Sequence, residues 1–487
     1  QNAKAEALFE NIYQARLARS PIDQAFEGIR DQQDKWDDYS DAYLLESHRL
    51  DRAHLRKLEA LTPDRLSDAN QLNLRLYRQE LQGAIDEFQW RFHRYPINHM
   101  TGIHTGVAAV LIRLHRIETV KDAGDYINRL NGVEHLFDQV IDGLKTREGM
   151  GIVAPRFVYE RAIDSVRKII TGQPFEGSVL ADSPLFADFK RKVDALDITS
   201  ERKLNLQVTA QQALLDSLGP AYRKLIDVLT ALKGRAEVEG GVWKLPQGQA
   251  FYRHALRQTT TTNMDAEAIH LLGLQEVERI HGEMRAILEQ AGYDGDLSDF
   301  FAYMQSEPTF FYPQTGGGKQ AYIDEADRLL SEMRLRLPEI FSTVPEAELV
   351  VKAVEAFREK ASVGSAFYQP GAPDLSRPGV FYVNTYDMSA MPKYSLPTYA
   401  YHEGIPGHHM QVSIAQELKN IPRFRRAGSY VAYAEGWGLY AEFLPKELGL
   451  YADLYTDFGR LSLELWRACR LVLDTAIHER RWSREEA

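Results

Sequence analysis

The sequence of 487 residues has one cysteine, no long apolar run and no dense basic tract. The single Cys469 excludes an intrachain disulfide, and fits either a cytoplasmic protein or an exported protein without disulfides. No stretch of about 18 or more apolar residues is present, so we expect no transmembrane segment. The formal net charge is −11 and the arginine clusters are short, which argues against nucleic acid as a partner.

Helical periodicity dominates the rest of the chain. Apolar residues recur at three- and four-residue spacing over 5–18, 22–33, 39–60, 65–92, 119–147, 155–171 and 200–233, and Asp265 opens another such run. No internal repeat or long flexible linker interrupts this pattern. We therefore predict a mainly α fold in which residues 1–487 form a single large helical domain.

One short segment has a different pattern. A Pro/Gly/Asp-rich turn sequence separates Ala366-Phe367-Tyr368 from a β-type run at Val380–Asn384. This predicts a small β-sheet near residues 365–385. An edge strand beside a groove can pair with an extended peptide, although a hairpin that only covers the core fits the sequence equally well.

The end of the sequence has the form of a helix start. Ser483 and Glu486 have the spacing of a capping box, and a single helical turn is not stable alone. We expect the natural protein to continue beyond Ala487.

The segment with the clearest chemistry starts at His402-Glu403. In many zinc enzymes two histidines one helical turn apart bind the metal, and a glutamate after the first acts as general base. Here Pro406 occupies the position of the second histidine, so the next candidates are His408 and His409. Neither lies beside His402 on an undistorted helix.

The Pro406-Gly407 pair is expected to distort this helix. A bulge that absorbs two positions brings His408 into the place of the second ligand, and we favour it. His409 then lies behind the ligands or faces the substrate.

A third ligand is expected from the apolar run Tyr433–Glu442, which contains Glu435 and Glu442. A carboxylate is costly to bury without a partner, and a metal ion is one such partner. We favour Glu435 as the ligand, because the glycines beside it permit close approach of the backbone. Glu442 is then expected to orient a ligand histidine.

These residues predict a zinc-dependent hydrolase. Three protein ligands leave a position for water, whose proton Glu403 accepts during attack on a carbonyl. The same ligands also suit manganese, cobalt or iron. The developing oxyanion needs a further donor, for which the candidates are His478, Tyr382, Tyr394 and Tyr399. Arg467 and Arg470 could clamp a substrate carboxylate, although arginines at helical spacing more often pair with acidic neighbours. Asn384 is a further candidate to support a ligand or to contact the substrate.

These motifs together resemble a large, mainly bacterial family catalogued as domain of unknown function 885. The resemblance rests on His402–His409, Ala434–Glu442, Tyr95–Asn98, Ser376–Asn384 and Arg470–His478, and it covers nearly the whole chain. Members of this family are typically longer at the C-terminus. Many carry export signals or lipoprotein leaders, which implies a periplasmic or cell-envelope location, with the cytoplasm as the alternative.

The family is similar in outline to helical zinc peptidases of the neurolysin, angiotensin-converting and thermostable carboxypeptidase type. That similarity implies a deep groove flanked by a small sheet, and a carboxypeptidase or dipeptidase activity on short peptides. Two other functions fit the same residues: a zinc amidase acting on a non-peptide or cell-wall amide, and a non-catalytic peptide-binding envelope protein with a structural metal.

Overall fold

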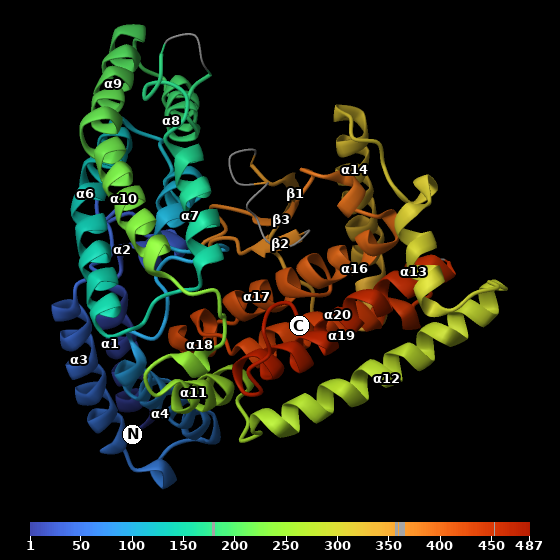
Figure 1. Cartoon of the computed structure of the whole chain (residues 1–487). Helices are drawn as coiled ribbons and strands as arrows, with labels where there is room; N and C mark the ends of the chain where they lie inside the picture. Colours follow the sequence, from blue (N-terminus) through green and yellow to red (C-terminus); the bar gives the residue numbers. More distant parts are fainter. Residues whose placement is uncertain (178–180, 356–358, 360–365, 452) are drawn as a thin grey trace. The chain divides into compact units, whose positions relative to one another are not determined.

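The protein is mainly helical, which confirms the predicted fold class (Figure 1). The computed structural model describes residues 1–177, 181–355, 359, 366–451 and 453–487. Packing groups them into two compact units: Gln1–Glu239 with Pro422–Phe424, and Gly240–Ile421 with Arg425–Ala487. Whether residues 1–487 form a single domain therefore stays a prediction.

The first unit consists of helices. They are α1 (Asn2–Leu17), α2 (Pro21–Phe26), α3 (Asp41–Glu59), α4 (Asp68–Glu87), α5 (Ile103–Ala109), α6 (Val120–Gly149), α7 (Arg156–Ile169), α8 (Pro184–Asp194), α9 (Ser200–Ala213) and α10 (Gly219–Arg235). The helix predicted over 22–33 is shorter than expected. It ends at Phe26 because Gly28 follows with a φ of 82°, a left-handed conformation that stops a right-handed helix.

Aromatic side chains form part of the core of the first unit. Tyr77 stacks on Phe424 with ring centroids 3.9 Å apart, and Phe9 packs against both rings. All three are buried. A short helix, α18 (Arg423–Ala427), supplies Phe424.

The second unit contains the predicted chemistry. Its helices are α11 (Gly248–Thr260), α12 (Ala266–Ala291), α13 (Leu297–Ser306), α14 (Gly316–Arg336), α16 (Leu396–Tyr399), α17 (His408–Glu417), α19 (Val431–Glu447) and α20 (Leu454–His478). Asp265 caps α12, as its sequence predicts. Among the described helices of both units, none is long and apolar enough to cross a membrane.

The predicted small β-sheet is present in the second unit. Strands β2 (Ala366–Gln369) and β3 (Gly379–Val383) pair antiparallel, and β1 (Leu349–Ala353) pairs parallel to β3, so that the order is β1-β3-β2. Strand β1 lies outside the segment that we predicted. Ser365, where that segment begins, lies outside the described residues. Strand β2 is an edge of this sheet.

One face of the sheet supports the segment that carries the motif. Phe381 and Val383 of β3 share a core cluster with Tyr401 and Ile405. Because side chains alternate along a strand, Tyr382 lies on the opposite face, where it stacks on Phe367 at 4.9 Å between ring centroids. The core cluster also includes Leu330 of α14. Figure 1 shows helix α14 beside the sheet.

The predicted capping box forms at the end of the chain. The Ser483 N–H donates to Oε2 of Glu486 at 2.7 Å, and the Glu486 N–H donates to the Ser483 hydroxyl at 3.2 Å.

Candidate metal and catalytic centre

The helix that carries His402 and Glu403 breaks where Pro406-Gly407 predicts a distortion. Helix α16 continues as a π-helix over Ala400–Gly404, and α17 begins again at His408. A Cβ atom at Gly407 would lie 1.9 Å from the carbonyl oxygen of His402, so this tight turn admits only glycine. The break brings His408 back to His402.

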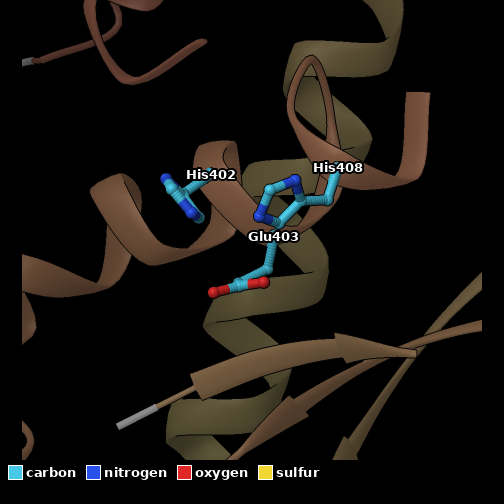
Figure 2. A group of neighbouring side chains, drawn as sticks. All are labelled: His402, Glu403 and His408. Atoms are coloured by element: carbon cyan, nitrogen blue, oxygen red, sulfur yellow. The ribbon is translucent and has the colours of Figure 1, made fainter. Parts of the chain in front are cut away.

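The carboxylate of Glu435 lies close to both histidine rings. The rings of His402 and His408 have centroids 4.6 Å apart (Figure 2). Glu435 reaches them from α19, with one carboxylate oxygen 3.6 Å from Nε2 of His402 and the other 3.8 Å from Nε2 of His408. Ligand atoms around a tetrahedral zinc ion lie about 3.4 Å apart. These three side chains therefore fit a zinc ion with small movements.

Two carboxylates compete for the third ligand position. One carboxylate oxygen of Glu403 and one ring nitrogen of each histidine all lie within 4.8 Å of one another, so Glu403 completes a possible ligand set with His402 and His408. Glu403 also accepts a hydrogen bond from the backbone N–H of Tyr368, and Figure 2 shows its carboxylate directed toward the strands. Because this hydrogen bond holds Glu403, we favour Glu435 as the ligand and place Glu403 beside the metal position.

His409 points away from this cluster. It is fully buried, its Nε2 lies 3.1 Å from the carbonyl oxygen of Ala347, and its Nδ1 lies 3.1 Å from the hydroxyl of Tyr368. Burial lowers the pKa of His409 to about 4, so the ring is neutral. Of the two histidines, His408 is therefore the candidate for the second metal ligand. His409 instead anchors the side chain of Tyr368.

Three residues on one face of helix α19 lie beside the ring of His402. Glu435 approaches Nε2, and Glu442, two turns further along, approaches Nδ1 at 2.7 Å. Between them, a Cβ atom at Gly438 would lie 2.5 Å from Cε1 of His402. The ring can occupy this position only because residue 438 is glycine.

Arg467 of α20 holds Glu442 in place. Its Nη2 lies 2.8 Å from Oε1 of Glu442, and its Nη1 lies 3.3 Å from Oε2. Since Glu442 then accepts the proton on Nδ1 of His402, Nε2 of the neutral ring has a lone pair for a metal. Arg467 is committed to this ion pair, which removes it as a clamp for a substrate carboxylate. Arg470 lies over the ring of Trp466 at 4.9 Å.

Burial and neighbouring charges shift the pKa values of the histidines and of Glu403 in this cluster. Burial disfavours the charged form of His402, but hydrogen bonds to Glu435 and Glu442 outweigh it and raise its pKa to about 9. Burial and the charge of His402 lower the pKa of His408 to about 4. Burial raises the pKa of Glu403 to about 7, against the charge of His402 and the Tyr368 hydrogen bond. A pKa near neutrality is what a general base requires.

The structure does not bring His478 to this cluster. Its Nδ1 accepts the N–H of Val242 at 3.1 Å, and its ring packs against Tyr252. His478 follows Arg467 by eleven residues on α20, which is roughly 16 Å along a helix. The prediction that His478 supplies the oxyanion donor is therefore wrong in geometry.

The other predicted donors also lie elsewhere. Tyr382 is on the face of β3 that turns away from the motif. Tyr394 packs against Phe310 with ring centroids 5.5 Å apart, and Tyr399 packs on the cluster around Tyr401. The side chain of Asn384 donates to the Glu359 carbonyl at 2.8 Å and accepts the Tyr386 N–H at 3.1 Å.

Two features of the site were not predicted from the sequence. The backbone N–H of Tyr368 has no sequence signal, because any residue of β2 except proline provides this donor. The need for glycine at 438 was only partly indicated, since a Cβ atom at Gly436 close by would meet no atom within 4 Å. The deep groove stays a prediction, because two cavities in the described part of the second unit are lined by other residues.

Comparison with known proteins places the chain in a family. Residues 21–487 match the family described as "Bacterial protein of unknown function (DUF885)", and the chain belongs to it. This confirms the resemblance to that family. No curated protein matches the chain.

Two solved structures share the fold. A structure described as that of the putative lipoprotein from Colwellia psychrerythraea is 26% identical, with a TM-score of 0.91 over 99% of this chain and 84% of that chain. "A putative lipoprotein of unknown function from Shewanella oneidensis" is 16% identical, with a TM-score of 0.63 over 99% of this chain and 85% of that chain. At this lower identity the likeness shows the fold alone.

Proposed function

We propose that this protein is a zinc-dependent hydrolase that cleaves amide bonds in short peptides. The observation that carries the proposal is the convergence of His402, His408 and Glu435, with Glu403 beside them. Two imidazoles and one carboxylate are a frequent ligand set of catalytic zinc, which leaves a further position for water or substrate.

Each residue has a distinct role in this proposal. His402 and His408 offer their Nε2 atoms and Glu435 its carboxylate to the cation. Bound zinc would polarise a carbonyl and lower the pKa of water. Glu403, whose pKa is raised to about 7 by burial, accepts the proton and returns it to the leaving amine. Arg467 and Glu442 keep the His402 ring oriented.

The edge of β2 supports a peptide as substrate. The N–H of Tyr368 reaches Glu403, so the side of β2 opposite its pairing with β3 faces the catalytic carboxylate. An extended peptide that adds to such an edge places its own amide groups next to this carboxylate. The outline of the site, with two histidines and a glutamate from a later helix, also resembles that of helical zinc peptidases.

A cell-envelope location belongs to the same proposal. The Colwellia protein, which shares the fold over 99% of this chain, is described as a lipoprotein. A peptidase at the envelope would meet peptides taken up or released by the cell.

The test combines metal analysis with a substrate panel. The purified protein is loaded with zinc, and metal content is measured by mass spectrometry together with the release of amines from dipeptides, tripeptides and blocked amides. We expect about one zinc per chain and hydrolysis of short peptides. Hydrolysis of non-peptide amides alone would identify an amidase. Bound zinc without any turnover would identify a structural metal and contradict the proposal.

A further inference from the structure

One of the two cavities in the described part of the second unit has the size of a small-molecule site. Its volume is about 500 Å³, within the range of about 300–1,000 Å³ that is typical of small-molecule sites. The walls come from the turn at Pro308–Phe310, from α14, from the start of α16 and from the first turn of α20. None of the residues assigned to the metal centre lines it.

Aromatic rings form one part of the wall. Phe310 packs against Tyr394 at 5.5 Å and against Tyr455 at 4.9 Å between ring centroids, and Tyr312 lies nearby. Leu329 and Pro397 add apolar surface. Ring faces carry negative potential and attract polarised C–H groups, so this wall suits a ligand with apolar C–H faces.

The charged side chains of the cavity already have partners. Arg328 is held between Glu325, at 2.7 Å, and Glu332, at 3.0 Å. Lys393 donates to the carbonyl of Thr309 at 2.9 Å and lies 4.7 Å above the ring of Tyr312. Asp453 accepts the N–H of Thr456 at 2.7 Å, as the cap of α20.

This pairing decides the class of ligand. An ion of either sign would meet a like charge, because Arg328 and Lys393 line the cavity together with Glu325, Glu332 and Asp453. The same groups retain unused donors and acceptors, because a guanidinium has five N–H donors and a carboxylate has about four acceptor positions. A ligand rich in hydroxyl groups can use both kinds at once.

We propose that this cavity is a binding site for an uncharged saccharide of one or two rings, whose C–H faces pack on the rings of Phe310, Tyr394 and Tyr455 and whose hydroxyls bond to Arg328, Glu332 and Lys393. The site is independent of the hydrolase activity proposed above.

Binding is measured directly on the whole chain by saturation-transfer NMR and calorimetry. The probes are glucose, galactose, N-acetylglucosamine, maltose and cellobiose, with leucine, benzoate and 1,4-diaminobutane as ionic comparisons. We expect saturable, millimolar binding of at least one sugar and none of the ionic compounds. Absence of binding by all five sugars, or stronger binding of an ionic compound at this cavity, overturns the proposal.

Two variants locate the binding. Thr309→Trp fills the cavity from its exposed rim, and Arg328→Ala removes its central donor; each is expected to weaken sugar binding at least tenfold. Arg279→Ala is the matched control, because Arg279 is also held by glutamates three residues before and four residues after it, on α12. Circular dichroism checks that the variants fold. Unchanged binding in Arg328→Ala places any sugar elsewhere and contradicts the proposal, whether or not Thr309→Trp folds.

Discussion

Nδ1 of His402 lies 2.7 Å from Oε1 of Glu442, and this carboxylate is in turn held by Arg467. The arrangement fixes both the direction of the ring and the nitrogen that carries its proton. Glu442 is almost completely buried, at 1% exposure, so the cost of burying it must be offset by these two partners.

Replacing this carboxylate tests its positioning role. We expect Glu442→Gln to weaken zinc binding by about 10–100-fold, because the amide no longer holds the correct tautomer of His402. Stability is expected to fall by about 1–3 kcal/mol, since Arg467 loses its charged partner. Zinc titration and denaturant unfolding measure the two effects. Glu447→Gln, an exposed change on the same helix, is the control. Zinc affinity equal to that of the control would contradict the role.

The general base is tested by Glu403→Gln. We expect kcat/KM for short peptides to fall by about 10²–10⁴-fold while one zinc remains bound, because the amide cannot accept a proton. Steady-state kinetics and metal content are measured on the same preparation. Loss of the metal in this variant would instead make Glu403 a ligand.

The choice between adjacent histidines has a direct test. His408→Ala is expected to abolish stoichiometric zinc binding, since Nε2 of His408 faces Glu435 at 3.8 Å. His409→Ala is expected to retain zinc and to lose about 1–3 kcal/mol of stability, because the Ala347 carbonyl and the Tyr368 hydroxyl lose their partner. Metal analysis and thermal unfolding separate the two. The reverse pattern would reverse the assignment.

The contact between α19 and His402 predicts a difference between two glycines. Gly438→Ala places a methyl group 2.5 Å from Cε1 of His402, so the ring must shift and zinc affinity is expected to fall at least tenfold. Gly436→Ala meets no atom within 4 Å and is expected to bind zinc normally. Both changes raise helix propensity by a similar amount, which makes the pair a matched comparison. Equal zinc affinity in the two variants would show that His402 is not held against Gly438.

The metal-free protein is expected to lose stability as pH rises. The pKa of folded His402, about 9, lies above its ordinary value of 6.5. The contribution of His402 to the free energy of unfolding is therefore complete below about pH 6.5 and is lost as pH rises through 9. This contribution amounts to at most about 3 kcal/mol. Glu403 acts in the same direction, because its pKa is raised from 4.5 to about 7.

Denaturant unfolding at several pH values, in the presence of a chelator, measures this loss. His402→Gln is the control, and it is expected to flatten the profile between pH 7 and 9. Saturating zinc is expected to flatten it too, because the cation takes over the role of the proton. A wild-type profile without slope in this range would refute the charge arrangement described for His402.

Part of the site could be predicted from the sequence because Glu435 and Glu442 lie on one regular helix. The interval of seven residues between Glu435 and Glu442 places both on one face of α19, and Pro406-Gly407 marks the break that returns His408 to His402. The same helical geometry explains why the prediction for His478 fails. Along one helix, His478 lies roughly 16 Å from Arg467.

Other features depend on pairing between distant segments. Strand β1 joins the sheet through the parallel pairing of Leu349 with Gly379, which no local pattern indicates. The Tyr368 N–H that reaches Glu403 is equally invisible in the sequence, because it depends on which side of β2 pairs with β3. Local periodicity defines the helices, whereas the alignment of strand and helix depends on the whole fold.

The exposure of Glu435 has a kinetic consequence. Its side chain is 60% exposed, whereas those of His402 and His408 are 6% and 14% exposed. A cation held here would enter and leave past the one ligand that water reaches, by detachment of a single carboxylate. Exchange with a chelator should then depend on the first turns of α19, which carry Glu435.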